Sequence, residues 1–236
     1  AFYFDILDAC AQPGCPLCRM GQRMVDRYLD ALLYEGVNDP GVRRTWRRSL
    51  GFCTDHAWRL LETLVGASLG IAILYRDLLE QVSKGLEQAS RDSPRRLLRS
   101  AQEALDREQP SAATEGAVRA LEPKEPCPAC LYRDKMVAQA IISLVDTLPD
   151  DERLQAALRG SAGLCLPHLR QALALTRNEE GFDILIAMAQ EQVAGLRHEL
   201  SEFIRKNDHR FRDEGLGAEG HSWRRALAWL VGAKGV

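Results

Sequence analysis

The sequence predicts an all-α protein that is internally duplicated. Three observations lead to this prediction: apolar residues recur at helical spacing along much of the chain, no stretch alternates as a half-buried strand would, and one pattern of cysteine and histidine occurs twice. The two copies of this pattern are offset by 112 residues at every cysteine and histidine. We therefore expect two helical Cys3His metal knots, one in each copy, related by a pseudo-two-fold axis.

Composition narrows the class of protein. The chain has 236 residues, a net charge of −2 and 46% hydrophobic residues, which argues against both a generally basic nucleic-acid binder and an acidic disordered chain. The longest uncharged run, residues 63–75, is shorter than the roughly 20 residues that cross a bilayer. Seven cysteines, an odd number, suit metal ligation better than a disulfide framework, and the first residues do not resemble a secretion signal. These features predict a cytoplasmic protein.

The chain is expected to divide into four segments. Residues 1–88 contain an N-terminal segment and the first helical metal repeat, and residues 89–123 form a polar linker with a helix. Residues 124–208 contain the second helical metal repeat, and residues 209–236 form a loop and a C-terminal amphipathic helix. In the first repeat, apolar positions follow one helical face from Cys18 to about Gly36, and Asp39-Pro40 is typical of the start of a second helix. The second repeat has the same order of predicted helices.

Two helices near the end of the chain carry clear apolar patterns. One has apolar residues at intervals of four and three, which indicates a helix packed along another helix: Ala189, Val193, Leu196, Leu200 and Phe203. The last helix has an apolar face made of Trp223, Leu227, Leu230 and Val231. We expect this short helix to pack back on its own domain, and docking on a partner is the alternative.

Each copy of the repeated pattern supplies three cysteines and one histidine, which are the usual ligands of structural zinc. The ligands are Cys15, Cys18, Cys53 and His56 in the first copy, and Cys127, Cys130, Cys165 and His168 in the second. Each Cys-x-x-Cys and Cys-x-x-His pair lies where a helix is expected to begin, and the positive end of a helix favours thiolates. We predict two zinc ions, one per repeat.

The seventh cysteine, Cys10, has no counterpart in the second copy. We expect it to be a small buried apolar residue, with the role of a fifth ligand as the alternative.

Other chemistries compete for the same residues. An iron–sulfur cluster could use the same ligands. A dithiol redox motif belongs with a βαβ pattern, which the sequence lacks. A catalytic zinc needs a nearby base, and the one candidate, Asp55, is replaced by Pro167 in the second copy.

A cluster of basic residues around Trp46 offers phosphate contacts: Arg43, Arg44, Arg47 and Arg48.

The Gly-Cys-Pro-x-Cys start at 14–18, the Gly-Phe-Cys-x-x-His centre at 51–56 and their second copy downstream resemble a family of bacterial and archaeal proteins of unknown function. The resemblance covers most of the chain apart from the linker, supports the ligand assignment and implies no activity. We favour a non-enzymatic zinc-binding protein that acts as a protein-interaction, scaffold or regulatory module, with another protein or a second copy as partner. The alternative is an iron–sulfur electron-transfer protein, and nucleic-acid binding through the arginine cluster is a third hypothesis.

Overall fold

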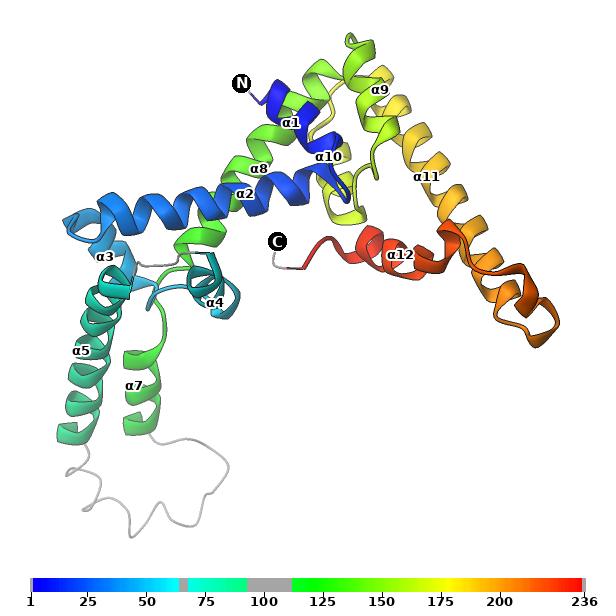
Figure 1. Ribbon diagram of the computed structural model, residues 1–236. Helices are drawn as coiled ribbons and strands as arrows, with labels where there is room; N and C mark the ends of the chain where they lie inside the picture. Colours follow the sequence, from blue (N-terminus) through cyan, green and yellow to red (C-terminus); the bar gives the residue numbers. More distant parts are fainter. Residues whose placement is uncertain (1, 64–67, 93–111, 235–236) are drawn as a thin grey trace. The chain divides into compact units, whose positions relative to one another are not determined.

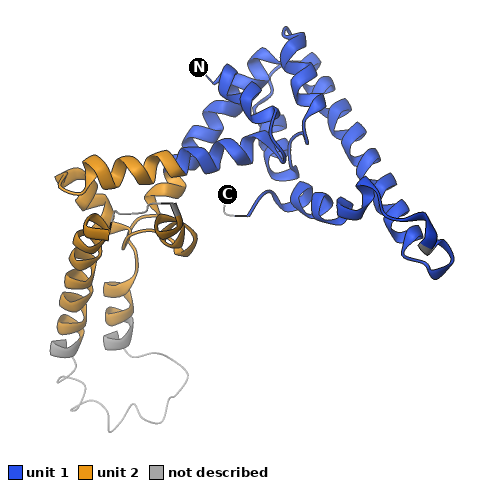
Figure 2. Cartoon of the chain, viewed as in Figure 1, with its two compact units in different colours: residues 1–25, 132–236 blue, residues 26–131 orange. Residues whose placement is uncertain are grey.

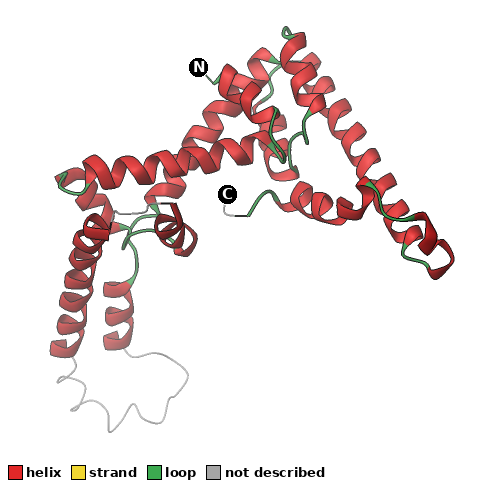
Figure 3. Ribbon diagram, in the orientation of Figure 1, coloured by secondary structure: helices red, strands yellow, loops and turns green. Residues whose placement is uncertain are grey.

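A computed structural model describes residues 2–63, 68–92 and 112–234, and Figure 1 shows its helices in chain order. Within these ranges the regular structure is helical, and no residue is in a β-strand (Figure 3). The all-α fold class is therefore confirmed. The helices are α1 (Tyr3–Cys10), α2 (Pro16–Ala31), η1 (Leu32–Gly36), α3 (Pro40–Arg48), α4 (Thr54–Thr63), α5 (Ser68–Asp92), α7 (Ala112–Leu121), α8 (Pro128–Thr147), α9 (Glu152–Gly160), α10 (Leu166–Leu175), α11 (Glu179–Lys206), η3 (His209–Glu214), η4 (Ala218–His221) and α12 (Ser222–Val231).

The chain forms two compact units, which Figure 2 distinguishes by colour. Unit 1 comprises residues 1–25 and 132–236, and unit 2 comprises residues 26–131. The boundaries between the units fall inside α2 and inside α8. Each unit therefore combines parts of both sequence copies, and the division into compact units differs from the segments that we expected from the repeat.

Local sequence signals explain where several helices begin. Asp39, Asp151 and Asn178 cap α3, α9 and α11, because the side chain of each accepts a backbone N–H three residues later, at 2.7, 2.7 and 2.6 Å. Equivalent helices also start at the offset of the motif. Pro16 and Pro128, Pro40 and Glu152, and Thr54 and Leu166 are three pairs of first residues, and each pair is separated by 112 positions.

The core of unit 1 forms around α8. Five residues on one face of α8 are buried: Val137, Ala140, Ile141, Leu144 and Val145. Leu148, directly after the helix, is also buried. They pack in one cluster with Ile6 and Ala9 of α1 and with Leu185 and Met188 of α11. Helix α1 thus docks on the core of unit 1 and packs against α9.

Trp46 is at the centre of the smaller core of unit 2. Its side chain is 1% exposed, packs with Leu74 and Leu78 of α5, and donates a hydrogen bond from Nε1 to the Leu74 carbonyl at 3.1 Å. Its ring meets those of Phe52 and Tyr75 edge to face, at centroid distances of 4.8 and 5.5 Å. These contacts hold α3 on α5. In unit 2, α7 also packs along α5, while residues 93–111 of the expected linker lie outside the described ranges.

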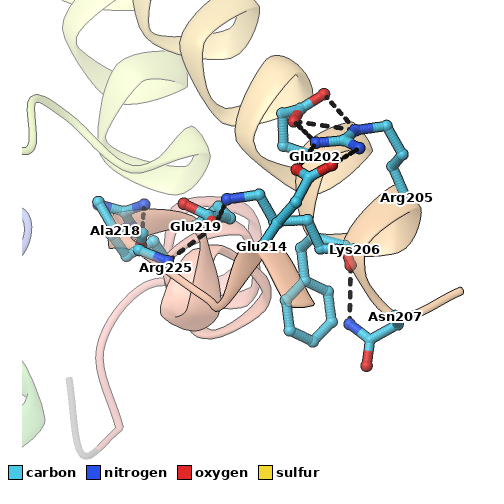
Figure 4. Close-up of polar contacts among 10 residues, drawn as sticks. Glu202, Arg205, Lys206, Asn207, Glu214, Ala218, Glu219 and Arg225 are labelled. Atoms are coloured by element: carbon cyan, nitrogen blue, oxygen red, sulfur yellow. Dashed lines mark hydrogen bonds and ion pairs between the residues drawn. The ribbon is translucent and has the colours of Figure 1, made fainter. Parts of the chain in front are cut away.

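Ion pairs support the elements that follow α11 in unit 1 (Figure 4). Arg205 pairs with Glu202 at 2.9 Å and with Glu214 at 2.5 Å, and Lys206 pairs with Glu219 at 2.8 Å. The pairs with Glu214 and Glu219 join the end of α11 to η3 and η4. Helix α11 packs against the helices α10 and α12 and against η3 and η4.

The docking face of α12 differs from the one that its apolar pattern predicted. The helix packs on α10 and α11 as expected, with Ser222 buried and Trp229 packed against the core of unit 1. However, the four residues of the predicted face, Trp223, Leu227, Leu230 and Val231, are 46, 57, 53 and 65% exposed. In α12, therefore, apolar residues lie both on the docked side and on the exposed side.

Candidate metal centres

The eight predicted ligands gather into two groups, but the groups combine the two sequence copies. Site 1 consists of Cys15, Cys18, Cys165 and His168, and site 2 consists of Cys53, His56, Cys127 and Cys130. In each site all four ligand atoms lie within 4.8 Å of one another. Our expectation of one site per repeat was therefore wrong. Each site joins the Cys-x-x-Cys pair of one copy to the Cys-x-x-His pair of the other, and each lies within a single compact unit.

Two helix starts position the ligands of each site. In site 1, α2 begins directly after Cys15 and α10 begins directly after Cys165. In site 2, α8 begins directly after Cys127 and α4 directly after Cys53. The first backbone N–H groups of a helix have no partner within it, and the helix dipole is positive at this end. All four pairs are thus placed where backbone electrostatics stabilise thiolates.

The ligand spacing in site 1 matches a single tetrahedral ion. The Sγ atoms of Cys18 and Cys165 are 3.6 Å apart, and His168 Nδ1 lies 3.5, 3.4 and 3.2 Å from the sulfurs of Cys15, Cys18 and Cys165. Tetrahedral zinc, with sulfur at about 2.3 Å and nitrogen at about 2.0 Å, separates its ligand atoms by roughly 3.5–3.8 Å. The observed distances are close to these values.

Site 2 has the same internal geometry with greater exposure. The Sγ atoms of Cys53 and Cys130 are 3.8 Å apart, and His56 Nδ1 lies 3.3, 3.5 and 3.3 Å from the sulfurs of Cys53, Cys127 and Cys130. Its three cysteines are partly exposed, whereas in site 1 Cys15 is partly exposed and Cys18 and Cys165 are each 1% exposed. The two sites thus share a donor set and differ in access to solvent.

Close packing of the donors strongly shifts their pKa values. Hydrogen bonds with Cys165 and Cys18 hold the pKa of Cys15 well below its usual range, while hydrogen bonds to Cys15 and Cys18 raise the pKa of Cys165. Burial lowers the pKa of His168, but its bonds to Cys15 and Cys18 outweigh burial and raise it to about 9. In site 2, burial and the nearby Cys127 and Cys53 raise the pKa of Cys130 to about 12. A bound cation would let all the thiols of a site ionise together at neutral pH.

Cys10 lies outside both groups. It is buried in the core of unit 1, and burial raises the pKa of its thiol to about 11. This environment fits the expected small apolar residue, and the alternative role as a fifth ligand gains no support.

The arginine cluster of α3 is engaged in ion pairs within unit 2. Arg43 and Arg47 both pair with Asp77, at 3.2 and 2.9 Å, and Arg48 pairs with Glu125 at 2.6 Å. The intervening aromatic residue, Trp46, is in the core. The cluster therefore contributes to the packing of α3, and its charge is partly neutralised by acidic neighbours.

One contact to site 1 comes from a residue that the sequence did not single out. The backbone N–H of Ala233 donates to Cys18 Sγ at 3.4 Å. Any residue other than proline can supply such a donor, so the sequence contains no signal for it.

Helical structure with two compact Cys3His groups defines the class of this protein: an all-α protein with two candidate metal centres. The chain belongs to the family of unknown function DUF6062, which it matches over residues 3–235. This confirms the resemblance to an uncharacterised family.

A known relative covers a smaller part of the chain. A segment of 65 residues is 43% identical to the "Uncharacterized 23.9 kDa protein in xynA 3'region" of Caldicellulosiruptor sp. (strain Rt8B.4). The match covers 28% of this chain and 30% of that protein, so the chain spans under a third of the relative's length. No solved structure matches the chain. Among the described helices, none is long and apolar enough to cross a membrane.

Proposed function

We propose that this chain is a non-enzymatic scaffold protein in which two structural zinc ions hold the helices and the exposed helix surfaces bind another protein or a second copy. The observation that carries the proposal is the spacing of donor atoms, which suits one tetrahedral ion in each site. Zinc is the metal that best fits three thiolates and one imidazole in this geometry.

The same spacing favours a single ion over an iron–sulfur cluster. In a cluster the protein ligands bind different iron atoms, so their sulfurs lie farther apart than they do around one ion. Here each set of four donor atoms fits within 4.8 Å. The iron–sulfur protein is retained as the alternative function because its usual ligands overlap with this donor set.

A structural role follows from the number and placement of the ligands. Four protein ligands fill a tetrahedral zinc, whereas a catalytic zinc keeps one position open for water or substrate. Each site also ties together helices that are distant in the sequence: 147 positions separate Cys18 from Cys165, and 77 separate Cys53 from Cys130. A metal in each site would therefore close large loops of the chain.

The remaining parts of the proposal have different support. Exposed apolar residues, such as Trp58 and Leu61 on α4 and the four on α12, suit a protein partner. The recurrence of helix starts at 112 positions supports an internal duplication, with the pseudo-two-fold axis as its simplest geometry. Ligation by reduced thiolates suits the cytoplasm. Nucleic-acid binding through Arg43, Arg44, Arg47 and Arg48 is not favoured, because three of these are paired with carboxylates.

Metal analysis of untreated protein tests the proposal. We expect two zinc ions per chain, no visible absorption in anaerobically purified protein, and loss of the helical circular-dichroism signal when a strong chelator removes the metal. Protein without metal, or a full helical spectrum after both ions are removed, would contradict it. Visible absorption with stoichiometric iron and sulfide would favour the iron–sulfur alternative.

A further inference from the structure

The polypeptide that follows α12 lies against the sulfurs of site 1. We call residues 232–234 the C-terminal strap. At Gly232 the backbone turns with a φ of +86°, and a Cβ at this position would lie 3.6 Å from Cys18 Sγ and 3.8 Å from Cys165 Sγ. The next residue, Ala233, donates its N–H to Cys18 Sγ at 3.4 Å. The strap therefore covers two of the three thiolates of this site.

A side chain of α2 holds the strap in place. Gln22 Nε2 donates to the Lys234 carbonyl at 2.9 Å. Gln22 lies one helical turn after Cys18, so the ligand and the residue that anchors its cover belong to the same helix. The conformation at Gly232 is one that glycine adopts without strain and other residues rarely adopt. Together these contacts define a specific covering of site 1.

The N–H from Ala233 would reduce the reactivity of the Cys18 thiolate. A hydrogen bond to an ionised acceptor is stronger than one between neutral groups, and it draws negative charge from the sulfur. Groups around the ligands control both the electronic character of a metal site and the access of solvent to it. The strap supplies a donor and excludes solvent at the same sulfur, so both effects oppose attack on that ligand.

Site 2 differs in both respects. All three of its cysteines are partly exposed, whereas in site 1 Cys15 alone is partly exposed and Cys18 and Cys165 are buried. Within the described ranges, the hydrogen bonds to its sulfurs come from other ligands of the site, and no backbone N–H donates to them. The two sites therefore have equal donor sets but unequal protection.

We propose that the two sites have separate roles: site 1 is a structural site in which the C-terminal strap covers Cys18 and Cys165, and site 2 is the site that exchanges its zinc with the solution and reacts with thiol reagents. This assignment rests on the proposed function, because it requires that both sites bind zinc. The lability of site 2 would allow unit 2 to respond to the supply of zinc while unit 1 keeps its ion.

Labelling of individual cysteines with N-ethylmaleimide tests the assignment in the full, zinc-loaded chain. Mass spectrometry of peptides follows the labelling of each cysteine with time. We expect Cys53, Cys127 and Cys130 to react at least about tenfold faster than Cys18, since a charge-assisted hydrogen bond is worth about that factor or more. They should also react faster than Cys165, which is 1% exposed. A chromogenic zinc chelator should correspondingly withdraw one ion per chain before the other.

Substitution of Ala233 separates the hydrogen bond from simple burial. Ala233→Pro removes the N–H, and Ala233→Val keeps the N–H while it adds a comparable number of atoms. We expect Ala233→Pro to increase the labelling rate of Cys18 several-fold and to leave the rates in site 2 unchanged. Ala233→Val should behave like the natural sequence. Circular dichroism and zinc content establish that each variant is folded and loaded.

A second variant loosens the strap from outside the site. Gln22→Ala removes the bond to the Lys234 carbonyl and should also increase labelling of Cys18, even if Ala233→Pro fails to fold. Equal labelling in the two sites, or rates for Cys18 that neither substitution changes, would overturn the assignment. Failure of the proposed function gives a different result: all six ligand cysteines would then label at rates that a chelator does not alter.

Discussion

Paired cysteine substitutions can establish which ligands share an ion. In the structure, Cys18→Ala with Cys165→Ala removes two ligands from site 1, whereas Cys18→Ala with Cys53→Ala removes one ligand from each site. The first double variant should therefore keep one zinc per chain and the second should keep none. If each sequence copy closed its own site, the two results would be exchanged.

Zinc binding must supply more free energy than it costs to close the loops of the chain between the ligands, and this cost follows from the loop lengths. For the 147 positions between Cys18 and Cys165 and the 77 between Cys53 and Cys130, the chain-entropy relation for cross-links gives about 5 and 4.5 kcal/mol. The 34 residues between Cys18 and Cys53 would cost about 4 kcal/mol to close within one copy. Zinc binding supplies about 10–16 kcal/mol in zinc-finger peptides, which exceeds each of these costs.

Loss of one ion should therefore unfold the helices that depend on it. The zinc contribution is comparable to the roughly 5–15 kcal/mol net stability of a whole domain. For the first double variant, we expect a partial loss of helical circular dichroism together with one zinc per chain by elemental analysis. Cys10→Ala is the matched control, because it removes a buried cysteine that belongs to neither site and should leave two zinc ions. One zinc in the second double variant with none in the first would refute the assignment across copies.

Three further predictions concern residues outside the metal centres. Trp46→Phe removes the donor to the Leu74 carbonyl and should lower the free energy of unfolding of unit 2 by about 1–3 kcal/mol in urea titrations; an unchanged midpoint would contradict the importance of this bond. Because the folded pKa of Cys10 is raised to about 11 from about 9, its contribution to stability is present below pH 9 and is lost as pH rises toward 11. Urea titrations across this range should show a steeper decline for the natural chain than for Cys10→Ala, and parallel curves would argue against the shift. The bond from Lys206 lowers the pKa of Glu219 to about 2. The contribution of Glu219 to stability is therefore present above about pH 4.5 and is lost as pH falls toward 2. An NMR titration should show a higher Glu219 pKa in Lys206→Ala, and an unchanged value would refute the pairing.

The sequence by itself determined the class of fold, the residues of the two candidate metal sites and the starts of several helices. The buried residues of α8 recur every three to four positions, which is the spacing of one helical face and a local property of the sequence. Short-range chemistry placed the caps, such as Asp39 before Pro40. The two-residue spacing within each ligand pair is likewise a local property, because both donors must reach the same side of one helix start.

Other features depend on contacts between distant residues and could not be read from local patterns. The charged residues of α3 suggested a free basic surface, but Asp77 lies 30 positions beyond Arg47 and neutralises part of it. The apolar face of α12 suggested the side that docks, but the helix docks through other residues, including Trp229. The strap uses a backbone donor, which carries no mark in the sequence.

Only the tertiary structure decided how the ligands are divided between the two sites. The copies contain the same two ligand pairs, so a set of three cysteines and one histidine can be completed either within a copy or across copies. Loop entropy separates these arrangements by only about 1 kcal/mol per site, because its cost rises with the logarithm of loop length. The packing of α1 and the start of α2 with the core of α8 to α11 adds an apolar cluster of many buried residues, and this places Cys15 and Cys18 beside Cys165 and His168. A pattern of residues thus specified the donors, and burial of the surrounding core selected their partners.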